Sequence, residues 1–362
     1  MDLQLTEDQA FLLDTTRRFL DASAAIPAVR ALEEDPAGFA EADWRQGAEL
    51  GWTSLLVPEA LGGGSLSEHG LLDLVLVAEE MGRHVAPGPL APVNVVAAAL
   101  ASGGTPEQQE AVLPSLLDGS ALAAWCGHVP VEATADGDGW VLTGSIPAVE
   151  AGAQAEHLLV AASTGSEVVQ LLVPAATPGV TVTPRAGLDL VRRHAAVTFE
   201  AARVPREAVV GEPVEHSLQL ACVLQCAETC GVIDVVFTMT VEYLGDRYSF
   251  GRPLSSYQAL KHRLADDKMV LEACHATAGA AARAVATSAP EAAELVSVAK
   301  SWIGPHATEL IQDAIQLHGG IGVTWEHDLH LYLRRATVNR VLHGTPEWHA
   351  DRIAGGLLGV AS

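Results

Sequence analysis

Basic side chains are scarce in this chain. Its 362 residues include 21 lysines and arginines against 45 aspartates and glutamates, which gives a formal net charge of −24 at pH 7. Proteins that bind nucleic acids or anionic membranes present a basic surface, because they replace the counterions of phosphate groups. We therefore expect neither partner, and an anionic ligand would need a local basic pocket.

Long uninterrupted apolar runs are also lacking. No stretch approaches the ~20 apolar residues that a membrane-spanning helix requires, although 49% of the residues are hydrophobic. The first residues, MDLQLTEDQAFLL, carry acids where a secretory signal would carry positive charge. We expect a cytoplasmic protein without a membrane span.

Cysteines are few and odd in number, with five in the chain. Cys222, Cys226 and Cys230 recur every four residues, which places them on one face of a helix. A metal cluster is one interpretation of this spacing. We favour small buried side chains, because thiols are among the most buried groups in proteins. A disulfide scaffold is not indicated.

The secondary-structure pattern of the sequence changes twice. The first ~120 residues are helical, beginning with the capping-box pattern Thr6-x-x-Gln9. From about Ala121 to Gly211 short β-rich runs alternate with Gly, Pro and Asp, and helical periodicity then returns. We predict three domains, residues 1–120, 121–211 and 212–362, in agreement with the ~100–200 residues of an ordinary domain.

Four stretches match one known family in the right order. They are LTEDQAFLLDTTRRFL, GWTSLLVPEALGGGSLS, DRYSFGRPLSSYQALKHRLAD and QLHGGIGVTWEHDLHLYLRRA. With the helical, β, helical order, these stretches resemble the acyl-CoA dehydrogenase family over essentially the whole chain. The resemblance implies an α+β fold with an N-terminal helical domain, a middle antiparallel β domain and a C-terminal four-helix bundle.

The resemblance also implies a reaction. Members of this family use FAD to convert an acyl-CoA thioester to its trans-2-enoyl form: a carboxylate removes the α-proton while a hydride leaves Cβ for the flavin. Each FAD lies across a subunit interface. One subunit holds the isoalloxazine, and the C-terminal helices of the other hold the pyrophosphate and adenosine.

The partner-facing half of this site is intact in the sequence. By the resemblance, Arg247 would bond the pyrophosphate, Phe250 would pack beneath the cofactor, and glycines would permit a close backbone approach. The residues expected to bind the cofactor are Arg247, Phe250, Gln258, Gln316, Gly319, Gly320 and Thr345.

The flavin-holding half departs from the family pattern. Ala148 stands where the family has a Trp that packs on the flavin, and Glu150 where it has a Thr, so that a carboxylate would repel the anion formed on reduction. The small-residue loop that usually precedes this strand is missing between Cys126 and Asp136.

The family's catalytic base is also replaced. Counting from Gln316, the usual Glu of a Glu-Gly-Thr triplet falls on His343, in His-Gly-Thr. The alternative position, upstream of Arg247, is Ala221, which accepts no proton. An imidazole of pKa ~6.5 is a possible base, so His343 stays a candidate catalytic residue.

These features favour one hypothesis over two others. The chain resembles the subunit of actinobacterial heteromeric acyl-CoA dehydrogenases that lacks the catalytic Glu and completes the FAD site of a related partner carrying it. That complex, a heterotetramer, would act on a fatty acyl or sterol side-chain CoA thioester and pass electrons to electron-transfer flavoprotein or a similar acceptor. The alternatives are a self-sufficient homomeric dehydrogenase with a displaced base, and a flavin-free acyl-CoA-binding or lyase-type protein that uses His343.

A few other polar residues have alternatives to a functional role. His327 and His330 flank Asp328 with the spacing of metal ligands, but a clear fourth ligand is lacking, and we predict no metal site. The three consecutive basic residues 261–263 could bind a phosphate or a partner subunit, although a solvated helix face is the simpler interpretation. The remaining residues of this kind, expected to be packed or solvated, are His275, His306, Lys261, His262 and Arg263.

Overall fold

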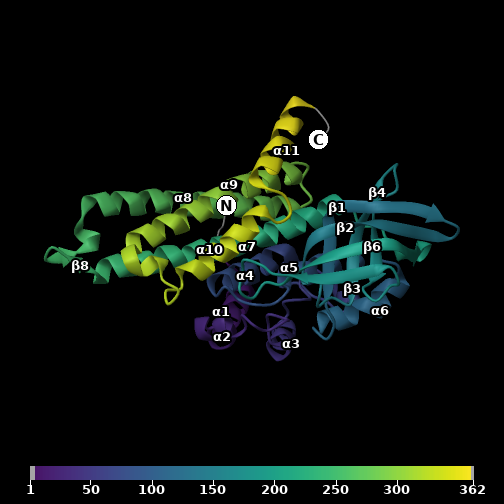
Figure 1. Ribbon diagram of the computed structural model, residues 1–362, viewed down its shortest axis with the longest axis horizontal. Coiled ribbons are helices and arrows are strands. Elements are labelled where there is room, and N and C mark those ends of the chain that lie inside the picture. The colour runs from purple at the N-terminus through teal and green to yellow at the C-terminus, as the bar shows by residue number, and fades with distance from the viewer. Residues whose placement is uncertain (1–4, 360–362) are drawn as a thin grey trace. The chain divides into compact units, whose positions relative to one another are not determined.

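A computed structural model describes residues 5–359 of the chain (Figure 1). By their contacts these residues form two compact units. The first unit comprises residues 5–19, 30–77 and 87–221, and the second comprises residues 20–29, 78–86 and 222–359. The three predicted domains stay a prediction, and their outer limits, residues 1 and 362, lie outside the described residues.

The N-terminal third is helical, as predicted. Thr6 N–H donates to Gln9 Oε1 and Gln9 N–H donates to Thr6 Oγ1, both at 3.1 Å, so the capping box before the first helix is confirmed. The elements of this segment are α1 (Glu7–Ser23), α2 (Ile26–Ala31), α3 (Glu41–Glu49), η1 (Glu59–Leu61), α4 (Gly70–Arg83), α5 (Leu90–Gly103) and α6 (Pro106–Leu117).

A seven-stranded sheet follows within the first unit. Its strand order is β5-β6-β2-β1-β3-β4-β7. The elements are β1 (Ala123–Asp136), β2 (Gly139–Glu150), β3 (His157–Ser163), β4 (Val168–Pro174), β5 (Val180–Arg185), β6 (His194–Pro205), η2 (Arg206–Ala208) and β7 (Val209–Val210).

The sheet is mixed, so the predicted antiparallel domain is wrong at one pair. β1 and β2 form a hairpin, but β3 lies on the other side of β1 and runs parallel to it, with Ala123 opposite His157. The chain crosses over β1 between β2 and β3, and a crossover of this kind produces a parallel pair. The alternation of apolar residues is the same in both pairings and does not distinguish them.

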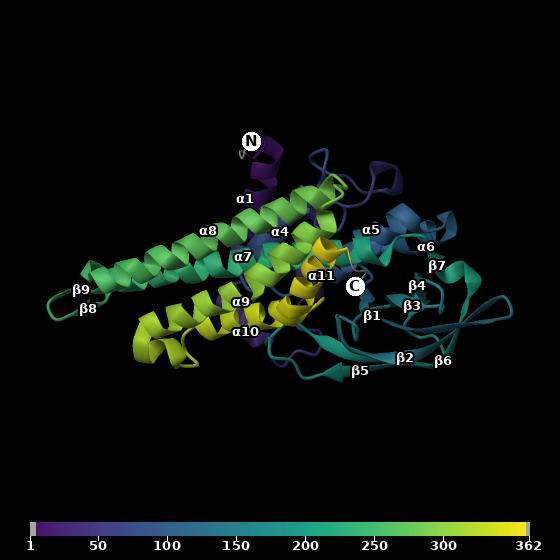
Figure 2. The ribbon, with the colours of Figure 1, turned by 90° about the horizontal axis from the view of Figure 1, so that it is seen from above.

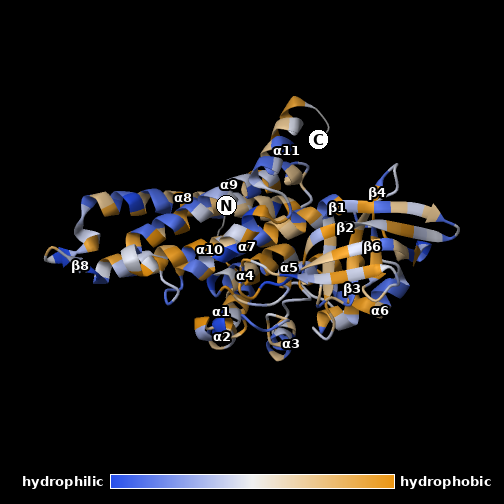
Figure 3. Cartoon of the chain, in the orientation of Figure 1, coloured by the Kyte–Doolittle hydropathy of each residue, from blue (hydrophilic) through white to orange (hydrophobic). Residues whose placement is uncertain are grey.

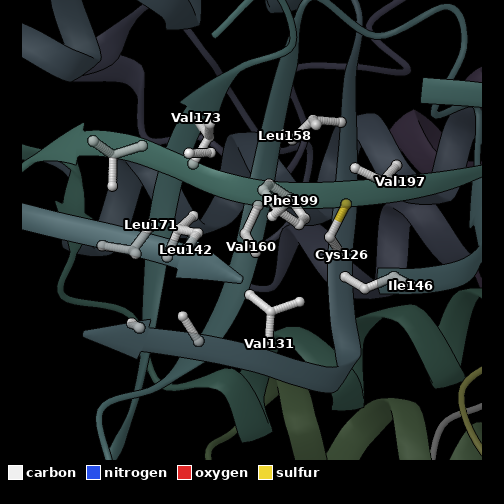
Figure 4. Packing of buried hydrophobic residues seen from close by; sticks show 14 of the residues in the cluster. Cys126, Val131, Leu142, Ile146, Leu158, Val160, Leu171, Val173, Val197 and Phe199 are labelled. Atoms are coloured by element: carbon white, nitrogen blue, oxygen red, sulfur yellow. The ribbon is translucent and has the colours of Figure 1, made fainter. Parts of the chain in front are cut away.

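A large core cluster of the first unit lies on one face of this sheet. Figure 4 shows Phe199 of β6 among side chains from neighbouring strands, including Val160, Leu171 and Val197. All of these side chains are at least 99% buried. Figure 3 shows the same alternation as hydrophobic bands along the strands and a largely hydrophobic α5, which contacts β1. Burial of this apolar surface is the main force that stabilises the sheet.

The second unit is built mainly from long helices that lie side by side (Figure 2). Each of α8, α9 and α10 is bonded to α7 through a buried or half-buried polar side chain. The elements are α7 (Val214–Asp246), β8 (Tyr248–Ser249), β9 (Arg252–Pro253), η3 (Leu254–Ser256), α8 (Gln258–Ala286), α9 (Ala292–His318), η4 (Gly319–Val323), α10 (Leu329–Val341) and α11 (Pro346–Leu358).

Helix α7 is more apolar than the sequence reading allowed. By length and composition it could cross a membrane, so the expectation that no stretch approaches this limit is wrong for α7. However, 83% of its most apolar stretch is buried inside the protein. This burial is what a central helix of a folded unit requires, and it accounts for the apolar sequence.

All five cysteines lie in the described part of the chain, and all are buried without a disulfide. The interpretation of small buried side chains is therefore confirmed. Burial raises the pKa of the Cys226 and Cys274 thiols to about 12, which keeps both protonated and unreactive near neutral pH.

Candidate functional site

A strained hairpin turn presents Phe250 to solvent. The two-residue turn between β8 and β9 consists of Phe250 and Gly251, with φ values of 50° and 80°. Positive φ at both central residues is the geometry of a type I′ turn, which matches the twist of the strands but is unfavourable for a phenylalanine. The Phe250 side chain is nevertheless 96% exposed, while the Tyr257 hydroxyl donates to Ser249 O at 2.9 Å and holds the hairpin.

A second exposed turn, Gly319–Gly320, follows α9. Gly319 has φ 65°, and a Cβ at either glycine would meet nothing within 4 Å, so the backbone here is open to a ligand. His318 lies buried beneath the turn, stacked on Tyr243 with ring centroids 4.3 Å apart. Burial lowers the pKa of His318, so this imidazole is neutral at pH 7 and serves as a packing platform.

The two turns lie at the same end of the helices. The Tyr243 hydroxyl near the end of α7 donates to His318 O at the end of α9, at 3.1 Å, and Figures 1 and 2 both place β8 and the α9–α10 connection together. The predicted cofactor residues gathered here are all exposed: Arg247, Phe250, Gln258, Gln316, Gly319 and Gly320. These residues form an open surface that includes one arginine and one exposed aromatic side chain.

His343 and Thr345 are not part of this group. They lie beyond the other end of α10, whose thirteen residues span roughly 20 Å. Thr345 caps α11 by accepting a hydrogen bond from Trp348 N at 3.2 Å, so this hydroxyl has a local structural role. The predicted site residues therefore fall into two groups. One lies at the exposed end of the helices, and the other lies in the turn between α10 and α11 that contains His343.

Comparison with known proteins identifies the family of the chain. Residues 6–120 match the N-terminal domain and residues 214–358 the C-terminal domain of acyl-CoA dehydrogenase. Acyl-CoA dehydrogenase IpdE2 of Mycobacterium tuberculosis is 32% identical over 339 residues, which cover 91% of each chain. The chain belongs to the acyl-CoA dehydrogenase family.

Two solved structures extend the likeness along the whole chain. The ChsE4-ChsE5 complex from Mycobacterium tuberculosis is similar at a TM-score of 0.91 with 29% identity, covering 100% of both chains. A variant of the Tcur3481-Tcur3483 steroid ACAD is similar at a TM-score of 0.90 with 30% identity, covering 98% of both chains. Members of this family are oxidoreductases that bind FAD.

The position where acyl-CoA dehydrogenases would carry a flavin-facing Thr is engaged in an ion pair in this chain. Arg192 Nε lies 3.2 Å from Glu150 Oε1, and both side chains are about 90% buried. Asp189 holds the adjoining loop by accepting from Val191 N and Arg192 N, each at 2.9 Å. Arg192 therefore balances the charge of Glu150 within the chain. The predicted repulsion between Glu150 and a reduced flavin assumed an unpaired carboxylate, whereas the structure shows a buried ion pair.

The segment in which the family's small-residue loop is missing forms a strand. Residues 123–136 form the continuous strand β1, whose pairing with β3 shifts register between Cys126 and Val131. The residues between these two positions are taken up by an irregularity in the sheet rather than by a projecting loop. The first unit therefore offers no counterpart, within β1, to the family's small-residue loop.

The other polar residues noted in the sequence have local partners. His327 Nδ1 accepts from Leu329 N at 3.3 Å, and His330 stacks on Trp325. His306 stacks on Trp302 with centroids 3.8 Å apart. Among the three consecutive basic residues 261–263, Arg263 Nε donates to Asp313 at 3.1 Å, and the other two side chains are exposed on α8.

An acidic group of the second unit could be mistaken for a cation site. The ligand atoms of Glu79, Asp234 and His275 lie within 4.8 Å of one another. Arg83, however, bonds both Glu79, at 3.0 Å, and Asp234, so a guanidinium already supplies the positive charge. The cluster is an ion-pair network that joins α4 to α7 and α8.

This network makes a pH-dependent contribution to stability. The hydrogen bond to Asp234 raises the pKa of His275, against burial, which lowers it. Burial alone would raise the pKa of Asp234, but the bond from His275 and the charge of Arg83 lower it overall. Because the folded pKa of His275 exceeds its unfolded value, the stabilisation is complete below about pH 6.5 and is lost as pH rises through the folded pKa.

We therefore expect the thermal midpoint to fall more steeply in the native chain than in a His275→Gln variant between about pH 6 and about pH 9. Circular dichroism melts at several pH values measure the two slopes. His306→Gln is the matched control, since its ring nitrogen bonds only the backbone of its own helix. Equal slopes for the native chain and His275→Gln would contradict the assignment.

Sequence reasoning missed the buried polar side chains of the second unit. Lys300, Arg335 and His349 are each at least 97% buried. Lys300 and Arg335 each bond a backbone carbonyl far along the chain, and His349 lies 3.3 Å from the Ser297 hydroxyl. A lone Lys within the apolar run AELVSVAKSWIG was the one available signal for Lys300. A charge on an apolar helical face requires buried partners, which the sequence does not identify.

Proposed function

We propose that this chain is the subunit of a heteromeric FAD-dependent acyl-CoA dehydrogenase that lacks the catalytic carboxylate and completes the FAD site of a related partner chain. The observation that supports this most is the exposed end of the second unit. There, a strained turn holds Phe250 in solvent beside an open Gly-Gly turn. Backbone strain at an exposed aromatic residue indicates a surface shaped for a ligand.

In this proposal the exposed residues divide the binding of FAD among them. Arg247 would donate charge-assisted hydrogen bonds to the pyrophosphate. Phe250 would pack against the cofactor, and the backbone at Gly319 and Gly320 would approach it closely. FAD, when bound, supplies the hydride acceptor for the β-carbon of the acyl chain.

The chain's own flavin-holding half supports a non-catalytic role. His343 stands in place of the carboxylate, Ala221 offers no substitute, and Glu150 is held in a buried pair with Arg192. The α-proton would then be removed by a Glu of the partner chain. In this account His343 removes no proton.

The comparisons suggest the assembly and the substrate class. The ChsE4-ChsE5 structure is a complex of two named chains, and the Tcur3481-Tcur3483 protein is called a steroid ACAD. By analogy we propose a heterotetramer that desaturates a bulky acyl-CoA, such as a sterol side-chain thioester. We also propose a cytoplasmic location, with electrons passing to electron-transfer flavoprotein or a similar acceptor.

One observation favours a second candidate. His343 has φ 59°, in the left-handed region where non-glycine residues are uncommon. Strain of this kind is concentrated at active sites, so a homomeric dehydrogenase or a flavin-free lyase that uses His343 remains the alternative. Loss of turnover in a His343→Ala variant of the lone chain would favour this alternative.

The proposed role can be tested by replacing Arg247 with alanine in the assembled complex. Losing a hydrogen bond to a charged group costs about 1.5–3 kcal/mol, so FAD should bind about 10–150-fold more weakly. Fluorescence titration of the apo complex with FAD measures this change.

Lys268→Ala is the control, because Lys268 is also an exposed cation of the second unit but pairs with Glu272 on the same helix. Its FAD affinity should equal that of the native complex. An Arg247→Ala complex that binds FAD as tightly as the native one would overturn the role of Arg247 in the proposal.

A further inference from the structure

The turn between α10 and α11 is held in an unfavourable conformation. His343 has φ 59° and Gly344 has φ 108°. A side chain at Gly344 would overlap the Trp348 ring and the His349 imidazole, so only glycine fits there. His343 has no such freedom, and a left-handed histidine persists only where its surroundings enforce it.

The carbonyl of His343 is one point at which the turn is held. His349 Nε2 lies 3.1 Å from His343 O, and Cys222 Sγ of α7 lies 3.8 Å from the same oxygen. A carbonyl oxygen only accepts, so His349 Nε2 donates to it, while Nδ1 lies 3.3 Å from the Ser297 hydroxyl. The 1% exposed imidazole therefore bridges α9 and the turn.

The residue before His343 is held by a buried cation. Lys300 Nζ donates to Gln225 Oε1 at 2.7 Å and to Asn339 O and Leu342 O at 2.8 Å each. These bonds use all three hydrogens of the ammonium, and the two carbonyls belong to the C-terminal end of α10, where a cation is stabilised by the helix dipole. Burial lowers the pKa of Lys300, and none of these three acceptors is a carboxylate.

We propose that Lys300 and His349 are positioning residues that force His343 into its left-handed conformation. Lys300 fixes the backbone before His343, and His349 fixes the carbonyl of His343 itself. Together they present the side chain of residue 343 in one defined direction. The inference goes beyond the proposed FAD-sharing role and does not depend on it, because each test below reads out the turn of the chain itself.

The first test compares two replacements of His349 by hydrogen exchange. Leucine removes the donor to His343 O, whereas the amide nitrogen of glutamine can replace Nε2. We expect exchange in the segment 340–349 to be about tenfold faster in His349→Leu and close to native in His349→Gln. Exchange in His349→Leu within about twofold of native, or equally fast exchange in both variants, would overturn the proposal.

The second test removes the strain itself. Glycine adopts positive φ readily, so a His343→Gly background no longer needs enforcement. In that background no strain is released when a contact is lost, so His349→Leu and Lys300→Met should each lower the thermal midpoint by more than in the native chain. A purely structural role for the two residues predicts equal shifts in both backgrounds, and that result would overturn the proposal.

A second variant covers a failure to fold. If His349→Leu does not fold, Lys300→Met carries the comparison between the two backgrounds. Equal shifts of its thermal midpoint in both backgrounds would overturn the proposal. None of these results depends on whether FAD binds, so they are separate from a failure of the proposed function.

Discussion

Replacing Arg335 with leucine is expected to lower the free energy of unfolding by about 3–5 kcal/mol, because it leaves a carboxylate buried without its counter-charge. Arg335 has no measurable exposure, and its Nη1 donates to Glu228 Oε1 at 2.7 Å. Its guanidinium also donates to Ala86 O and Val85 O at 3.2–3.3 Å, so the loop after α4 loses its anchor as well. Urea denaturation of the variant measures the loss.

A paired replacement separates the charge effect from lost packing. In Arg335→Leu combined with Glu228→Met no charge is left buried, and well-packed apolar pairs often equal or exceed the stability of the ion pair they replace. We therefore expect the double variant to recover most of the loss. Arg18→Leu, which removes an exposed pair with Asp14, should change stability by less than about 1 kcal/mol. If the double variant is no more stable than Arg335→Leu, the buried charge is not the cause.

Replacing Gly231 with alanine is expected to cost about 3 kcal/mol, at the upper end of the range for overpacking. A Cβ at Gly231 would overlap the Glu79 carbonyl oxygen of α4, and one at Gly82 would overlap the Glu228 carbonyl oxygen of α7. The two helices approach each other through this reciprocal pair of glycines. Because backbone atoms limit the approach, the helices must separate to admit a methyl group.

Gly245→Ala in the same helix is the matched control, since a Cβ there would meet nothing within 4 Å. Alanine has the higher helix propensity, so stability should stay the same or rise by up to about 1 kcal/mol. Chemical denaturation of both variants gives the comparison. Equal stability for Gly231→Ala and the native chain would show that α4 and α7 are less closely packed than described.

Local patterns in the sequence predicted much of the fold. The capping box at Thr6 and Gln9 and the β-rich runs between Ala121 and Gly211 both depend on neighbours in the chain. The parallel pairing of β1 with β3 does not, since it depends on a crossover between strands. Likewise, the apolar sequence of α7 was underestimated, because its burial depends on segments distant in the sequence, including α8, α9 and α10.

The candidate site was predictable only where a motif defined it. Arg247, Phe250 and the Gly319–Gly320 turn follow from family spacing, and the structure adds that they share one exposed end. Contacts between residues far apart in the sequence could not be predicted. Lys300 bonds carbonyls thirty-nine and forty-two residues away, so no local pattern could have predicted its link to the His343 turn.

The most direct test of the proposed role is the flavin content of the purified chain, alone and co-expressed with a related chain that retains the Glu-Gly-Thr triplet. Flavin absorbance and native mass together give the number of FAD molecules per complex. The account predicts a colourless lone chain and one FAD per pair of chains in the mixed complex. A lone chain that already binds one FAD per subunit and oxidises acyl-CoA would contradict it.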